Sequence, residues 1–242
     1  MSDSLGDRMK RQYEDRTRTM LPRRTYTILR ADGKAFHSFT RRCQKPYDAR
    51  LVEAMDVAAL TLCREAQGSC FAYVQSDEIS VLLTDFATIT TEAWFDGNLQ
   101  KIVSVAASIV TAAFNAQYSD GTSDHYQAHF DCRAFTIPDP VEVENYFIWR
   151  QQDAVRNSVS SLAQAHFSHK QLHRVNTSGM HELLFQEKGI NWNDLPTEQK
   201  RGRSVVYTEG DGWMVDHDTP TFTQDRDYLT SRIRSSEPVG VV

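Results

Sequence analysis

The order of strand-forming and helix-forming segments between residues 25 and 137 is the feature that most constrains the fold. Four short runs rich in β-branched and aromatic residues predict strands, at about Thr25–Arg30, Cys70–Gln75, Ile79–Leu83 and His129–Ile137. Two longer segments with apolar residues at helical spacing predict helices, at about Ala49–Gln67 and Asn98–Gln117. The resulting β-α-β-β-α-β order predicts an α+β fold with the split β-α-β arrangement.

This arrangement brings two acidic segments together. A right-handed crossover makes the first and second strands parallel, with the third strand between them. The first strand leads into Asp32 and Gly33, and Ser76, Asp77 and Glu78 form the tip of the hairpin between the second and third strands. Both segments therefore lie on the same edge of the predicted sheet. Asp32 and Asp77 become neighbours although 45 positions separate them, and Glu78 lies beside them.

Two neighbouring carboxylates repel each other unless a cation lies between them. Oxygen-rich ligands of this kind suit Mg²⁺, which binds one or two protein carboxylates together with substrate phosphates. Two such ions between two aspartates form the clamp that enzymes use for phosphoryl and nucleotidyl transfer. Ser76 can donate a hydrogen bond to a phosphate, Lys34 and Lys45 can neutralise one, and His37 can contact a nucleotide. The competing interpretation is that Asp32 and Asp77 are ordinary turn residues.

Charge is distributed unevenly along the 242 residues. Residues 1–50 contain 13 Lys and Arg against 6 Asp and Glu, whereas residues 51–242 contain 14 against 26, and the sum is −5. A basic segment leading into an acidic site suits an enzyme that handles polyanions with bound cations. No apolar run approaches the length of a membrane span, and the polar N-terminus is unlike a secretory signal. The four cysteines lack paired spacing, so we expect reduced thiols and a cytoplasmic location.

The chain divides into three expected parts. Residues 1–138 form an N-terminal arm and a ferredoxin-like palm of the polymerase and cyclase type. Residues 139–217 are expected to form a helical appendage that packs on the palm. Residues 218–242 are polar and weakly patterned and are expected to be a tail.

An ordered set of motifs resembles the tRNA-histidine guanylyltransferase superfamily, and within it the bacterial-type Thg1-like proteins, which act as 3′→5′ RNA polymerases. The resemblance runs from about residue 5 to residue 207. Its motifs are the Leu5–Lys10 start and the segments Arg30–His37, Lys45–Asp48, Ala72–Glu78, Phe130–Arg133, Tyr146–Asp153 and Gly189–Asn193.

The resemblance implies a site that holds two Mg²⁺ ions through Asp32, Asp77 and the Gly33 carbonyl, with Glu78 as a further catalytic residue. It implies a nucleotide-binding set for GTP or ATP made of Gly33, Lys34, Ala35, Phe36, His37, Lys45, Asp48 and Ser76. A second nucleotide or the tRNA would be bound by Lys101, Asp131, Arg133, Arg150 and Asn157. Many members of the family are tetramers, so a homotetramer is expected.

Two departures from the family pattern affect the expected substrate. Members that add the extra G to histidine tRNA usually carry His-Ile-Asn-Asn-Leu-Tyr-Asn where this chain has Val155–Ser161. The chain also has Tyr47 where the family often has Asn or Phe. The resemblance therefore favours template-directed repair of tRNA 5′ ends. The alternatives are G addition to histidine tRNA, a non-catalytic RNA-binding relative, and a nucleotidyl cyclase, whose Gly-Gly-Asp-Glu-Phe signature the chain lacks.

Overall fold

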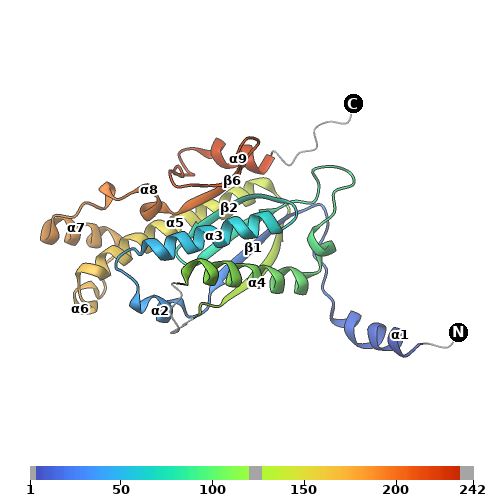
Figure 1. Ribbon diagram of the computed structural model, residues 1–242. Helices are drawn as coiled ribbons and strands as arrows, with labels where there is room; N and C mark the ends of the chain where they lie inside the picture. The colour runs from blue at the N-terminus through green and yellow to red at the C-terminus, as the bar shows by residue number, and fades with distance from the viewer. Residues whose placement is uncertain (1–3, 120–126, 235–242) are drawn as a thin grey trace.

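An antiparallel sheet lies at the centre of the computed structural model, which describes residues 4–119 and 127–234 (Figure 1). The strand order is β4-β1-β3-β2-β5-β6. The strands are β1 (Tyr26–Gly33), β2 (Ser69–Gln75), β3 (Glu78–Leu83), β4 (Phe130–Ile137), β5 (Arg203–Thr208) and β6 (Gly212–Asp216). Because β3 lies between β1 and β2 and is antiparallel to both, β1 and β2 are parallel. The predicted palm topology is therefore confirmed.

Two helices cover each face of the sheet (Figure 1). Helices α3 (Ala49–Glu65) and α4 (Leu99–Tyr118) pack on one face, and α5 (Pro140–His166) and α9 (Arg226–Arg234) pack on the other. The long helices begin where side chains accept hydrogen bonds from free backbone N–H groups. Asp48 caps α3, Asn98 caps α4 and Asp139 caps α5.

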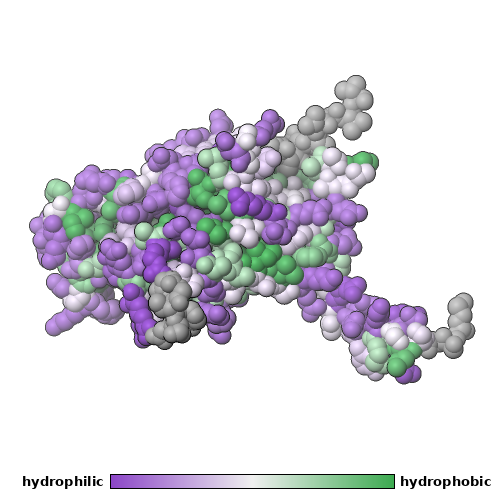
Figure 2. Space-filling model, viewed as in Figure 1, coloured by the Kyte–Doolittle hydropathy of each residue, from purple (hydrophilic) through white to green (hydrophobic). Residues whose placement is uncertain are grey.

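Helix α4 corrects the expectation that no segment approaches the length of a membrane span. By length and composition alone, Leu99–Tyr118 could cross a bilayer. Ile102, Ala106, Val110 and Phe114 are nonetheless buried at helical spacing against the sheet, as in a core helix. The hydrophobic surface along α4 contrasts with the largely hydrophilic N-terminal arm (Figure 2).

Helix α5 extends beyond the sheet and carries the appendage. Its first half packs on the sheet through Val143 and Phe147, whereas Leu162 and Ala163 in its second half belong to a separate small core. That core joins it to α6 (His169–Leu172), α7 (Thr177–Lys188) and the helical turn η5 (Trp192–Asp194). Helix α8 (Thr197–Arg201) contacts α5 through a hydrogen bond from Ser158 to the Gln199 carbonyl oxygen. The predicted helical appendage is present, but the chain then returns to the palm.

The sequence predicts a strand at Ser204–Tyr207, which β5 confirms, but the other residues after 200 differ from the expectation. Strands β5 and β6 extend the palm sheet beside β2, so residues 203–216 are part of the sheet. Residues 218–234 are not a loose tail, because Phe222, Leu229 and Ile233 are fully buried against the α5 face. Their wide spacing among polar residues hides them in the sequence. Residues 235–242 lie outside the described part of the chain, and the predicted boundaries at residues 138 and 217 remain predictions.

The N-terminal arm projects from the body of the molecule (Figure 1). It contains α1 (Leu5–Met9), η1 (Lys10–Glu14) and η2 (Asp15–Thr17), and none of these turns buries a residue. The remaining short elements are α2 (Phe36–Phe39), η3 (Thr40–Arg42) and η4 (Trp94–Gly97). All four cysteines are free thiols, as expected.

Candidate active site

The strand register places a row of polar side chains across one edge of the sheet. Asp32 of β1 is the direct partner of Asp131 on β4 and of Glu78 on β3, and Glu78 in turn pairs with Gln75 on β2. Paired positions share a face, and this face is the one that α5 covers, because Glu78 contacts Arg150 of that helix. The Gly33 backbone N–H donates to the Asp77 carbonyl oxygen at 3.1 Å. The predicted neighbourhood of Asp32 and Asp77 is therefore present.

The surroundings of Asp77 favour its neutral form. Burial is the main cause, the negative charges of Asp32 and Glu78 add to it, and together they raise the pKa of Asp77 to about 6. Hydrogen bonds from the Ser76 hydroxyl and from its own backbone N–H oppose the shift. Such uncompensated negative charge is relieved by a cation held between the carboxylates.

The donor set at this edge fits Mg²⁺ better than a transition metal. Asp32 and Asp77 offer hard carboxylate oxygens, and within residues 4–119 and 127–234 no three Asp, Glu, His or Cys side chains converge into a metal cage. Mg²⁺ typically keeps several waters and completes its coordination with substrate phosphates, so two carboxylates suffice. Gly33 lies at the end of β1 beside both acids, where its carbonyl remains a predicted ligand.

Glu78 and Arg150 have other partners than those the sequence predicted. The Arg150 guanidinium donates from Nε to Glu78 Oε1 at 2.7 Å and from Nη2 to Glu78 Oε2 at 2.8 Å. Both residues are buried, and Arg150 also contacts Asp153. A bidentate, buried pair of this kind leaves neither group available for a metal ion or for RNA. Glu78 is therefore a support for Asp77, and Arg150 fixes α5 to the hairpin.

Arg30 is a candidate site residue that the sequence interpretation missed. It lies two positions before Asp32 on β1, so both side chains project from the same face. Arg30 pairs in register with Arg133 on β4, and its buried Nε has no hydrogen-bond partner among the described residues. An unpaired guanidinium nitrogen beside a second arginine suits an anionic ligand. The two-residue period of a strand was the signal that could have identified it.

The loop after β1, which carries the predicted nucleotide-binding residues Gly33 to His37, turns at Ala35. Gly33 does not have a positive φ, and the left-handed residue is Ala35, with φ 52°. A Cβ on Gly33 would lie 2.2 Å from the Phe36 ring, so the glycine makes room for that side chain. Phe36 itself is buried in the core and cannot contact a nucleotide with its ring. Lys34 and His37 are exposed, as a phosphate-binding role requires.

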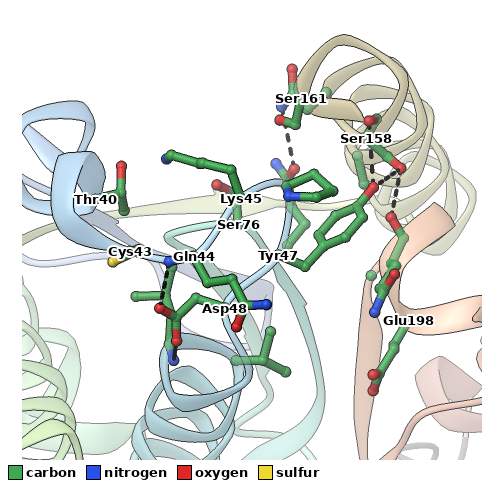
Figure 3. A pocket seen from close by; sticks show the side chains of 18 of the residues that line it. Thr40, Cys43, Gln44, Lys45, Tyr47, Asp48, Ser76, Ser158, Ser161 and Glu198 are labelled. Atoms are coloured by element: carbon green, nitrogen blue, oxygen red, sulfur yellow. Dashed lines mark hydrogen bonds between the residues drawn. The ribbon is translucent and has the colours of Figure 1, made fainter. Parts of the chain in front are cut away.

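Beside the acidic edge, a cavity of about 200 Å³ opens between the Gln44–Asp48 loop and α5 (Figure 3). Lys45, Asp48, Ser76 and Asn157 line it, so it unites three residues of the predicted nucleotide set with one of the second set. Lys45 is exposed.

Asp48 has a structural role that the sequence only partly predicted. Its carboxylate accepts backbone hydrogen bonds from Gln44, Arg50 and Leu51. It therefore shapes the loop and begins α3, and its role in nucleotide binding remains a prediction.

Lys101 is not near the acidic edge. It lies in the first turn of α4, where Asn98 caps the helix, whereas Thr111 and Asn115 near the other end of α4 bond to the start of β4 beside Gly33. At 1.5 Å per residue, about 15 Å of helix separates Lys101 from Thr111. On β4, Asp131 pairs with Asp32 and Arg133 pairs with Arg30, and both side chains are exposed; their binding of a second nucleotide or of the tRNA remains a prediction.

Comparisons with known proteins agree with this geometry. The family model described as "Thg1: tRNAHis guanylyltransferase" matches residues 6–138. A solved structure of a bacterial tRNA(His) guanylyltransferase (Thg1)-like protein in complex with ATP is 48% identical, covers 95% of this chain and 99% of its own, and superposes with a TM-score of 0.90. A second such protein, in complex with GTP, is 42% identical with the same coverage and a TM-score of 0.80.

A curated relative is similar to this chain over most of the length of both proteins. The tRNA(His) guanylyltransferase of Debaryomyces hansenii is 31% identical over 224 residues, which are 83% of this chain and 82% of that protein. The family model covers more than half of the chain. The chain therefore belongs to the Thg1 family of tRNA(His) guanylyltransferases, which are nucleotidyltransferases.

Proposed function

We propose that this chain is a Mg²⁺-dependent nucleotidyltransferase that adds nucleotides in the 3′→5′ direction to tRNA 5′ ends, directed by the opposite strand of the acceptor stem. The observation that carries the proposal is the convergence of Asp32 and Asp77 at a sheet edge beside the cavity that Lys45 borders. The ATP and GTP complexes of the two similar bacterial proteins support the choice of nucleotides.

In the proposed reaction, a phosphate oxygen of the RNA 5′ end attacks the α-phosphorus of ATP or GTP, and pyrophosphate leaves. The 3′-hydroxyl oxygen of the incoming nucleotide then attacks the 5′ phosphorus of the activated RNA, and the nucleoside monophosphate leaves. With a 5′-triphosphorylated RNA, pyrophosphate leaves in this step instead. Bound Mg²⁺ supplies neutralisation of phosphate charge and lowers the pKa of the attacking hydroxyl.

The described side chains divide this work between two areas. Asp32 and Asp77 hold the metal, while Lys34 and Lys45 neutralise the triphosphate of the activating nucleotide. Arg30 and Arg133 flank the acids on the α5 face, where they suit the second triphosphate or the phosphates of the RNA end.

Lys101 makes a homo-oligomer part of the proposal. Because it lies at the opposite end of α4, it can contribute to a nucleotide site only from a neighbouring copy of the chain. From Lys101 to Tyr118, α4 has no further charged residue, and such a face suits packing against another copy. Light scattering of the full chain is expected to give a tetramer.

The test is a series of tRNAs lacking one to three 5′ nucleotides, each with a 5′ monophosphate, incubated with Mg²⁺ and one labelled nucleoside triphosphate at a time. Template-directed repair predicts that the added nucleotide complements the opposite base and changes when that base is changed. Addition of a single G to histidine tRNA, whatever the opposite base, would instead support the histidine-specific activity of the named relatives.

A further inference from the structure

One serine hydroxyl joins four segments at the back of the cavity. Ser158 Oγ lies 2.8 Å from the Tyr47 hydroxyl, 3.0 Å from Trp192 Nε1 and 2.6 Å from the Gln199 carbonyl oxygen. These partners come from the Gln44–Asp48 loop, η5 and α8, and Ser158 itself lies on α5. Figure 3 shows the Tyr47 and Ser158 hydroxyl groups facing each other.

The direction of each bond follows from the chemistry of the groups. A carbonyl oxygen can only accept, so the single Ser158 proton points to Gln199. An indole N–H can only donate, so Trp192 occupies one lone pair of Ser158 Oγ. The remaining lone pair accepts the Tyr47 proton, and the buried Ser158 hydroxyl is then fully satisfied. Because the one donor and both acceptor positions of this hydroxyl are used, removal of one partner leaves an unsatisfied buried group.

Within the described part of the chain, Tyr47 makes the one hydrogen-bonded contact between the Gln44–Asp48 loop and α5. The other bonds of this loop close on itself or on α3, through the Asp48 carboxylate. Lys45 is two residues before Tyr47 and has no ion-pair partner among the described residues. The position of the Lys45 ammonium over the cavity therefore depends on where Tyr47 is held.

Helix α5 carries the anchors of both halves of the site. Arg150 fixes it to Glu78, directly after Asp77, and Ser158 fixes the Lys45 loop eight residues later. Eight helical residues span about 12 Å, so one rigid element sets the separation between the acidic edge and the cation. Both Tyr47 and the Val155–Ser161 segment are places where the chain departs from the family pattern, and here they touch each other.

We infer that Tyr47 and Ser158 are positioning residues, which hold Lys45 at a fixed distance from the Asp32 and Asp77 carboxylates and thereby set the affinity for the triphosphate group of the nucleotide. This role presupposes the proposed nucleotide site. Neither side chain needs to contact the base, so the effect of changing them is the same for any ligand with that triphosphate.

The test compares equilibrium binding of ATP, GTP and inorganic triphosphate, each with Mg²⁺, to the full chain and to Tyr47→Phe and Ser158→Ala. Loss of the Tyr47–Ser158 bond is expected to lower the affinity for all three ligands by the same factor, about fivefold to tenfold. The double variant is expected to bind no more weakly than Ser158→Ala, because Ser158→Ala already removes the hydrogen bond that Tyr47→Phe removes. Tyr228→Phe is the matched control, since its hydroxyl bonds to Asp216 and its segment does not line the cavity.

Three results would overturn the inference. Unchanged affinity in Tyr47→Phe would show that the loop is held without the bond. Weaker binding of ATP and GTP but not of inorganic triphosphate would assign Tyr47 to base contact instead. An equal loss of ligand affinity in Tyr228→Phe would mean that the assay reports lost stability and not the position of Lys45. If the unmodified chain binds none of the three ligands, the proposed nucleotide site itself is wrong, and the inference is refuted with it.

Discussion

The two adjacent acids at the tip of the β2–β3 hairpin have different surroundings. Asp77 is held by burial and by the nearby charges of Asp32 and Glu78 in surroundings that raise its pKa to about 6. Glu78 is enclosed with Arg150 in a bidentate pair. The sequence predicted that both are catalytic, because neighbouring carboxylates look alike until their partners are known.

Replacement of Glu78 therefore tests a structural role. Glu78→Ala leaves the buried Arg150 guanidinium without its bidentate partner and with the contact to Asp153, and loss of one partner of a buried pair is expected to lower the free energy of unfolding by about 3–5 kcal/mol. Urea denaturation measures this. Asp131→Ala, in the same row but exposed, is the control and is expected to change it by about 0.5 kcal/mol or less. A Glu78→Ala protein of normal stability without activity would make Glu78 a catalytic group.

Metal binding is expected to depend on pH through Asp77. Because its pKa in the folded protein is about 6, most of the group carries a proton below pH 6 that must leave before the metal binds. Mg²⁺ affinity is expected to fall about fivefold between pH 6 and pH 5 and to level off above pH 7. Calorimetric titrations at several pH values measure this, and Asp77→Asn should remove that dependence together with most of the binding.

The raised pKa of Asp77 also determines how the stability of the metal-free protein changes with pH. The folded, metal-free chain binds the Asp77 proton more tightly than the unfolded chain does, because the pKa is raised from 3.8 to about 6. The stabilisation from this proton is complete below pH 3.8 and is lost as the pH rises through 6. Between pH 5 and pH 7.5, the melting temperature of the metal-free protein should therefore fall relative to that of Asp77→Asn. An unchanged difference would contradict the shift.

At the scale of elements, α5 connects the parts of the site. Its first half packs on the sheet, its middle bonds to Glu78, and its second half carries both Ser158 and the appendage core. A helix of 27 residues can reach from the palm to the appendage because it is capped by Asp139 and supported along most of its length.

Helix α9 completes the covering of the same face. Leu229 is fully buried there, and Leu229→Ala is expected to lower the free energy of unfolding by about 2–5 kcal/mol through the cavity that it leaves. The exposed Ser231, two residues later, supplies the control Ser231→Ala, with little change expected. Urea denaturation followed by tryptophan fluorescence distinguishes them. Equal stability of the two variants would restore the view of residues 218–234 as a tail.

At the scale of the whole molecule, the palm could be predicted because its pattern is local. Strand and helix periods are visible over a few residues, and the handedness of the crossover then placed Asp77 beside Asp32. The missed features depend on distant partners. The unpaired Arg30 nitrogen, the Glu78–Arg150 pair and the burial of Phe222 become visible only when residues from different elements meet.

The direction of the N-terminal arm and the position of Lys101 could also not be predicted from local sequence patterns. The basic composition of the arm was evident from the sequence, but its projection from the body was not (Figure 1). Lys101 was assigned to the site by resemblance, and α4 places it at the far end of the sheet. A single chain therefore contains the acidic edge and the cavity, whereas any contribution of Lys101 to them requires a second chain.

The central claim is that Asp32 and Asp77 together hold the metal for nucleotidyl transfer. The most direct measurement is the rate of nucleotide addition to a 5′-triphosphorylated, truncated tRNA by Asp32→Asn and Asp77→Asn, with melting temperatures recorded alongside. The account predicts that each variant folds normally and loses addition by about a thousandfold or more, because this substrate needs no prior activation and tests the transfer step alone. Full addition by either variant would contradict the account.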